Sequence, residues 1–114
     1  MKKSKTCIIA EAGVNHNGSL KKAAKMIKIA SKIGADIIKF QAFDVNETIL
    51  KNTKKAAYQI KHTKKNEDQF EMIRKLEFKI NDFVYLKNLC KKFKIEFLCS
   101  VFHIKTLDLL KKLK

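Results

Sequence analysis

The sequence contains no proline, no tryptophan and only three glycines, and Arg74 is the single arginine among its 26 basic residues. These scarcities exclude a proline- or glycine-rich linker and a low-complexity segment. No stretch approaches the roughly 20 apolar residues of a membrane span, so we expect no membrane partner. The basic start is followed only by the short apolar run Cys7–Ala10, too short for a signal peptide. The three cysteines, an odd number without metal-site spacing, favour reduced thiols in the cytoplasm.

Charge is the most unusual property of the composition. The 26 basic and 11 acidic residues give a net charge of +15, so a polyanion-binding surface has to be considered. Near absence of arginine weakens a base-reading role, because arginine is the usual bidentate reader of guanine. The lysines recur on the solvent side of every predicted helix, as solvated lysines do. We therefore expect no nucleic-acid partner, and a Lys-rich polyanion-binding module is kept as the alternative function.

The pattern of apolar residues predicts strands and helices in alternation. Cys7–Ala10 resembles a strand that is covered on both faces. An amphipathic helix follows from Leu20, with Ser19 as N-cap and Gly34 at its end, and the segment 35–40 is a second strand. Strand, helix and strand with short connections indicate a βαβ crossover with parallel strands.

The second half continues the alternation after a long stretch, from Gln41 to about Glu67, with little periodicity. The further elements expected are a short helix at 69–76, a helix starting after Asn81, a strand at 95–99, a loop at 100–103 and a helix from Thr106. Alternating elements imply a parallel sheet with helices outside, in either a doubly wound sheet or a partial (β/α)₈ barrel. Because a whole barrel needs about 250 residues, 114 residues hold about three of its eight βα units.

Polar residues stand where the predicted strands end. These are Glu11, then Lys39 with Gln41, then Ser100, and in parallel folds such positions meet at one rim. A carboxylate, an ammonium, a carboxamide and a hydroxyl can together handle protons and bind an anion. Each residue alone is more often a solvated or ion-paired side chain, so the succession carries the prediction.

Other candidates are weaker. The segment 15–18 could bind phosphate at a helix N-terminus, but a simple βα turn is favoured. His16, His62 and His103 are widely separated and define no metal site. Cys99 lies beside a possible site without an evident base, so an inert core thiol is favoured. Helical spacing predicts core positions for Phe70, Phe78, Phe83 and Phe93.

Two motifs in the right order, Ile8–Gly18 and Gly34–Gln41, resemble the sialic acid synthase family, which includes the legionaminic and pseudaminic acid synthases. Lys55–Gln59, Phe70–Glu77 and Glu96–Phe102 agree with it. The resemblance implies a (β/α)₈ barrel that condenses phosphoenolpyruvate with an N-acyl hexose such as N-acetylmannosamine. The product is a nine-carbon 2-keto sugar acid, and phosphate is released. It also implies a divalent metal, Mn²⁺ or Mg²⁺, and a homodimer for a full-length relative.

The resemblance gives each strand-end residue a role. Glu11 falls on a catalytic glutamate near the reacting centre, and Lys39 on the lysine that holds phosphoenolpyruvate. Gln41 matches a glutamine that orients the sugar, Ser100 keeps a hydroxyl that would contact phosphoenolpyruvate, and Phe102 is retained beside it.

Two departures from the family pattern matter. Val101 stands where the family has proline, which is expected to leave the loop less rigid. The family's two metal-binding histidines and its C-terminal sugar-binding domain would lie beyond residue 114. We therefore expect no metal ligand here and no metal ion bound by this fragment alone. We therefore expect residues 1–114 to be an N-terminal fragment of a TIM-barrel synthase domain, without a second domain and inactive alone. A non-catalytic remnant is a further alternative, against which the intact strand ends argue.

Overall fold

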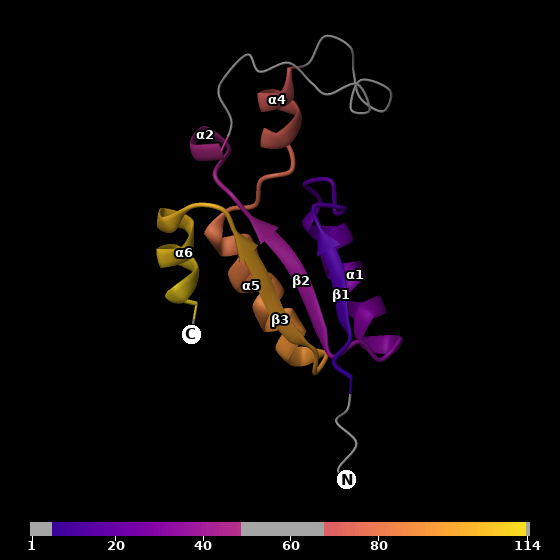
Figure 1. Ribbon diagram of the computed structural model, residues 1–114. Coiled ribbons are helices and arrows are strands. Elements are labelled where there is room, and N and C mark those ends of the chain that lie inside the picture. Colours follow the sequence, from indigo (N-terminus) through magenta and orange to yellow (C-terminus); the bar gives the residue numbers. More distant parts are fainter. Residues whose placement is uncertain (1–5, 49–67, 114) are drawn as a thin grey trace.

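The computed structural model describes residues 6–48 and 68–113. Its sheet has three parallel strands in the order β1 (Ile9–Gly13), β2 (Ile37–Ala42) and β3 (Glu96–Val101) (Figure 1). The predicted α/β class with a parallel sheet is therefore confirmed. The motif at 55–59 and His62 lie outside the described residues.

Five described helices accompany the sheet: α1 (Leu20–Lys32), α2 (Val45–Thr48), α4 (Gln69–Arg74), α5 (Ile80–Lys92) and α6 (Ile104–Lys111). The two longest, α1 and α5, lie side by side against the same face of the sheet (Figure 1). None of the described helices is long and apolar enough to cross a membrane.

The core lies between the sheet and these two helices. Alternate residues of β2, among them Ile38 and Phe40, are fully buried and pack with Ile27 of α1 and Leu86 of α5. The three phenylalanines Phe70, Phe78 and Phe83 are buried, and Phe93 packs against the core, as predicted.

The opposite face of the sheet is left open by the described residues. Ile9 of β1 is 48% exposed and Leu98 of β3 is 38% exposed. The expectation that the first strand is covered on both faces is thus wrong for this chain, because both packed helices lie on one side. The strand also begins later than Cys7 and continues to Gly13.

The caps predicted for the first helix are confirmed. The Ser19 hydroxyl accepts a hydrogen bond from the Lys22 amide at 3.2 Å. At the other end, Gly34 has a φ of +84°, and the Ala35 amide donates to the Ala30 carbonyl. This is the left-handed glycine termination that closes many helices.

Several boundaries in the second half differ from the prediction. Helix α5 begins at Ile80, because the Asp82 carboxylate accepts a hydrogen bond from the Lys79 amide at 2.8 Å and caps the helix there. Strand β3 continues through Ser100 and Val101, which were expected in a loop, because both pair with β2.

Candidate active site

The carboxylate of Glu11 and the ammonium of Lys39 form an ion pair on the open face of the sheet. The two residues are register partners on β1 and β2, and Lys39 Nζ lies 2.6 Å from Glu11 Oε2. A β-bulge follows Glu11, between it and Gly13. The side chains are 48% exposed for Glu11 and 31% for Lys39, so a ligand can reach both. The predicted meeting of these two strand-end residues is confirmed.

Gln41 and Ser100 lie one step further along the same edge. They are register partners on β2 and β3, and Gln41 shares a face with Lys39 because strand residues alternate between faces. Gly13 lies between Glu11 and Gln41. A Cβ there would be 3.5 Å from Glu11 Oε1 and 3.8 Å from Gln41 Nε2. The sheet thus brings a carboxylate, an ammonium, a carboxamide and a hydroxyl to one edge.

Phe102 follows the end of β3 and is 59% exposed. It borders a hollow of about 190 Å³ that Gln41 also lines. The other lining residues are mostly apolar: Val14, Phe43, Thr48, Ile73 and Leu76. The five residues predicted for the site therefore all lie at or just beyond the carboxyl edge of the sheet.

His16 occupies the turn after β1 and is 1% exposed. Its Nδ1 accepts a hydrogen bond from the Gly18 amide at 3.1 Å, and its ring stacks on Phe78 at 3.9 Å between centroids. Burial lowers the pKa of this imidazole. The turn interpretation of residues 15–18 is confirmed, and His16 is part of the packing rather than of the open face.

Cys99 lies on the helix side of β3, where it packs against the core. Burial raises the pKa of its thiol to about 12 and that of Cys90 to about 11. The thiols are thus protonated at neutral pH, which agrees with the predicted inert role.

The sequence did not point to a cluster formed by Glu47, His103 and Lys105 at the same end of the sheet. Glu47 Oε1 lies 2.7 Å from Lys105 Nζ, and Glu47 Oε2 lies 3.4 Å from His103 Nε2. The hydrogen bond with Lys105, followed by the charge of that residue, lowers the pKa of the Glu47 carboxyl. The only local signal was an acidic residue in a segment without periodicity, and its partners are 56 and 58 residues away in sequence.

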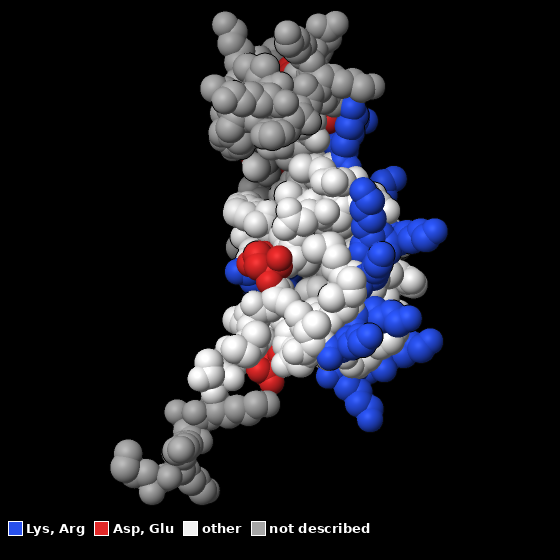
Figure 2. Space-filling model, turned by 90° about the vertical axis from the view of Figure 1, so that its right-hand side faces the viewer, with Lys and Arg blue, Asp and Glu red and all other residues white. Residues whose placement is uncertain are grey.

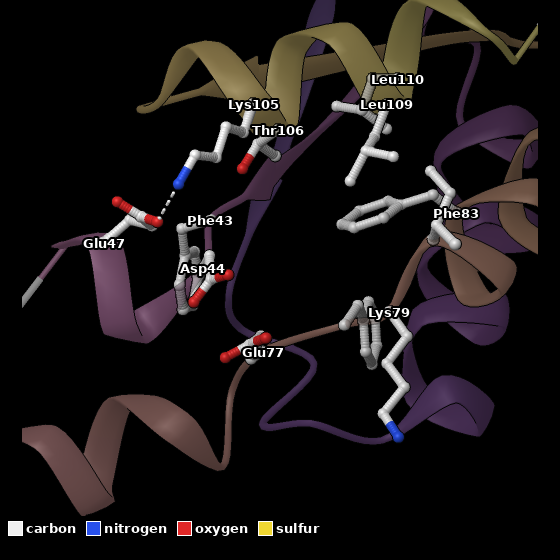
Figure 3. Close-up of a pocket in the computed structure, with 12 residues that line it drawn as sticks. Phe43, Asp44, Glu47, Glu77, Lys79, Phe83, Lys105, Thr106, Leu109 and Leu110 are labelled. Atoms are coloured by element: carbon white, nitrogen blue, oxygen red, sulfur yellow. Dashed lines mark hydrogen bonds and ion pairs between the residues drawn. The ribbon is translucent and has the colours of Figure 1, made fainter.

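The cluster borders a second hollow of about 330 Å³ between α2, α6 and the segment before α5 (Figure 3). Phe83, Leu109 and Leu110 line its apolar side. Asp44, Glu47 and Glu77 face it from the other side, with Lys79 and Lys105 nearby (Figure 3).

Among residues 6–48 and 68–113, no three histidines, cysteines or acidic residues gather closely enough to hold a metal ion. The lysines concentrate elsewhere. Figure 2 shows basic side chains along the helix side of the molecule, and α1 alone carries Lys21, Lys22, Lys25, Lys28 and Lys32. Since the buried residues of α1 face the sheet, this basic surface lies away from the Glu11–Lys39 pair.

A parallel sheet with a charged pair and polar side chains at its carboxyl edge is the framework of α/β enzymes. Comparison with known proteins identifies the family within this class. Residues 26–114 match the NeuB family, and the chain therefore belongs to that family.

Named relatives agree with this. The chain is 47% identical over 109 residues to the N,N'-diacetyllegionaminic acid synthase of Campylobacter jejuni, covering 96% of this chain and 33% of that protein. The corresponding synthase of Legionella pneumophila is 40% identical, with 94% and 30% covered. The chain thus spans about a third of the length of these curated relatives, in their N-terminal part.

Solved structures show the same likeness. The N-acetylneuraminic acid synthetase of Leptospira borgpetersenii superposes with a TM-score of 0.78 at 31% identity, over 96% of this chain and 34% of that one. The spore coat polysaccharide biosynthesis protein SpsE of Bacillus subtilis gives a TM-score of 0.66 at 29% identity, over 97% and 28%.

Proposed function

We propose that this chain supplies the first three βα units of a (β/α)₈ barrel that joins phosphoenolpyruvate to an N-acyl hexose. The single observation that carries this is the Glu11–Lys39 pair on the open face of a sheet whose relatives are named as sugar acid synthases. In the reaction, the enol carbon of phosphoenolpyruvate attacks the aldehyde carbon of the hexose and a carbon–carbon bond forms. The aldehyde oxygen takes up a proton, water adds at the phosphate-bearing carbon, and phosphate leaves.

Lys39 is the anion-binding residue of the proposal. An ammonium has three N–H donors, and Glu11 occupies one direction at 2.6 Å. The remaining donors are available to the phosphate or carboxylate of phosphoenolpyruvate, for which a compact cation is well suited. The position of Lys39 in a strand, with buried neighbours on both sides, holds that charge in place.

Glu11 is the proton-handling residue. Its carboxylate is anchored by Lys39 and remains half exposed, so it can accept or return a proton at a bound substrate. Gln41 is proposed to orient the hexose and Ser100 to contact phosphoenolpyruvate. Phe102 is proposed to bound the substrate on the side of the 190 Å³ hollow.

The divalent metal that the resemblance implies finds no set of ligands among the described residues. When bound, such a metal would polarise the aldehyde. A homodimer and a cytoplasmic location belong to the same proposal.

The test is a chimaera in which residues 1–114 replace the matching part of the Campylobacter jejuni synthase. It is assayed for phosphate release and product mass with phosphoenolpyruvate, Mn²⁺ and a panel of N-acyl hexoses, beside the isolated chain. We expect turnover by the chimaera and none by the chain alone. Enzyme-like turnover by the isolated chain would contradict the proposal that residues 1–114 carry only part of the site. A folded but inactive chimaera would contradict the proposed reaction.

Variants of the chimaera test the two residues separately. Loss of an acid–base group typically lowers kcat by about 10²–10⁴-fold, and we expect this for Glu11→Gln. Lys39→Met keeps the apolar stem, and losing a charged hydrogen bond should raise KM for phosphoenolpyruvate by about 10–100-fold. Glu96→Gln, at the far end of β3, and Lys28→Met, on the outer side of α1, are matched controls. Variants of Glu11 and Lys39 that behave like these controls would refute the assigned roles.

A further inference from the structure

Glu47 links the segment that follows β2 to the segment that follows β3. Its two carboxylate oxygens face different partners, Lys105 Nζ at 2.7 Å and His103 Nε2 at 3.4 Å. Figure 3 shows the side chains of Glu47 and Lys105 pointing toward each other from α2 and α6. The link joins residues 58 positions apart, across the end of the sheet where the proposed site lies.

The imidazole of His103 is oriented for this contact. Its Nδ1 accepts a hydrogen bond from the Lys105 amide at 3.3 Å and so caps the start of α6. In a neutral ring that accepts at Nδ1, the proton resides on Nε2, which is the nitrogen facing Glu47. The carboxylate thus lies opposite an N–H donor and an ammonium at once.

The Glu47 end of the link is fixed to the core. Asp44 Oδ1 accepts from the Asn46 amide at 2.9 Å, and the Thr48 hydroxyl donates to the Asp44 carbonyl at 2.7 Å. Val45 is 1% exposed, and its amide donates to the Glu77 carboxylate at 3.3 Å. The short helix α2, which begins four residues after Gln41, is therefore held in place. Gln41 is the last residue of β2 whose side chain lies on the polar face.

The other end of the link is the site itself. His103 directly follows Phe102 and lies three residues after Ser100. The connection from β3 to α6 is short, so the position of His103 constrains Phe102, whereas Ser100 is already held opposite Gln41 by the pairing of β3 with β2. The Glu47 contacts consequently hold Phe102, the first residue beyond that pairing, close to the Gln41 side of the site.

We propose that Glu47 is a positioning residue, which through His103 and Lys105 holds Phe102 against the Gln41 side of the site. This rests on the proposed function for its catalytic consequence, whereas the positioning itself does not. Phe102 lies two residues after Ser100, which is assigned to phosphoenolpyruvate, and is itself proposed to bound the substrate. Its displacement therefore weakens ground-state and transition-state binding alike. Such a loss raises KM and leaves kcat nearly unchanged.

The kinetic test uses the chimaera with Glu47→Ala, and Asp108→Ala as the control. Asp108 is an exposed carboxylate on α6 with its own lysine partner, Lys111, at 3.9 Å, so the control removes an ion pair from the same helix. We expect Glu47→Ala to raise KM for phosphoenolpyruvate by about tenfold, with kcat within about threefold. In a double-mutant cycle, the effects of Glu47→Ala and Lys105→Ala should not add. Equal KM values for the Glu47 and Asp108 variants would overturn the proposal.

A second readout is independent of activity. Hydrogen exchange measured by mass spectrometry, in the 114-residue chain and in the chimaera, should be faster in peptides covering residues 100–105 for Glu47→Ala than for Asp108→Ala. Unchanged exchange in those peptides would also overturn the positioning role. An inactive parent chimaera with the expected exchange difference would refute the proposed function and leave the positioning supported.

Discussion

Replacing Gly18 by alanine should destabilise the fold by more than a left-handed backbone alone explains. Gly18 has a φ of +70°, and a Cβ on it would lie 2.0 Å from the carbonyl oxygen of Lys75 and 3.2 Å from its carbonyl carbon. That oxygen belongs to the backbone, so it cannot rotate away. The close approach lets the turn after β1 pack on the end of α4, next to the stacked rings of His16 and Phe78.

The magnitude follows from two costs. A left-handed conformation costs a residue with a Cβ about 1–2 kcal/mol. Forcing an extra carbon into a packed site costs about 1–3 kcal/mol more. We therefore expect Gly18→Ala to lower the free energy of unfolding by about 2–5 kcal/mol, a large part of the 5–15 kcal/mol typical of a domain.

Gly34→Ala is the matched control. Gly34 has a φ of +84°, but no atom lies within 4 Å of the position of its added Cβ. Only the backbone cost, about 1–2 kcal/mol, should apply there. Urea unfolding followed by circular dichroism gives both values, provided that the m-value does not change. If the two variants lose the same free energy, the close approach of Gly18 to Lys75 contributes nothing and the reasoning is wrong.

Three other perturbations follow from burial. Because burial raises the thiol pKa to about 11 for Cys90 and about 12 for Cys99, iodoacetamide at pH 8 should alkylate only the exposed Cys7 of the folded chain, and a second adduct by mass spectrometry would contradict this. Because burial lowers the pKa of His16, the unfolded chain binds more protons than the folded one just below pH 6.5, so the free energy of unfolding should decrease as the pH is lowered through that window. A His16→Leu variant whose free energy of unfolding, measured in urea titrations, has the same pH dependence would refute this. Leu86→Ala should cost about 2–5 kcal/mol, because the side chain is fully buried between α5 and the sheet, and a loss below about 1 kcal/mol would show that the site collapses around it.

The local parts of the fold could be predicted because their causes are local. Ser19 and Gly34 cap α1 through hydrogen bonds to residues within five positions, and the apolar spacing between them defines its buried face. The start of α5 could also have been found, since Asp82 stands three residues after Lys79 at a capping position. The end of β3 could not, because Ser100 is a strand residue only through its pairing with β2.

The candidate site could likewise be predicted only in part. Strand ends with polar residues predicted that Glu11 and Lys39 would share an edge, but their 2.6 Å contact depends on the strand register and on the bulge after Glu11. Register is set by packing between distant segments, and a one-residue slip would move the side chains to the other face. The contact of Glu47 with Lys105 could not be predicted from the sequence, because it depends on where the ends of β2 and β3 lie relative to each other.

The open face of the sheet affects how strongly the charged side chains of the site interact, but not how they are arranged. Three strands suffice to fix Glu11 opposite Lys39 and Gln41 opposite Ser100, because the register does so. The charges, however, stand beside exposed apolar residues such as Leu98, with water on one side. Two charges 4 Å apart interact with about 1 kcal/mol in water and about 4 kcal/mol at an effective dielectric constant of 20. The same lysine would therefore hold an anion far more strongly beneath a covering layer than on this open face. The affinity of Lys39 for an anion thus depends on what covers the sheet, whereas the arrangement of the polar side chains at its edge is already set by these three strands.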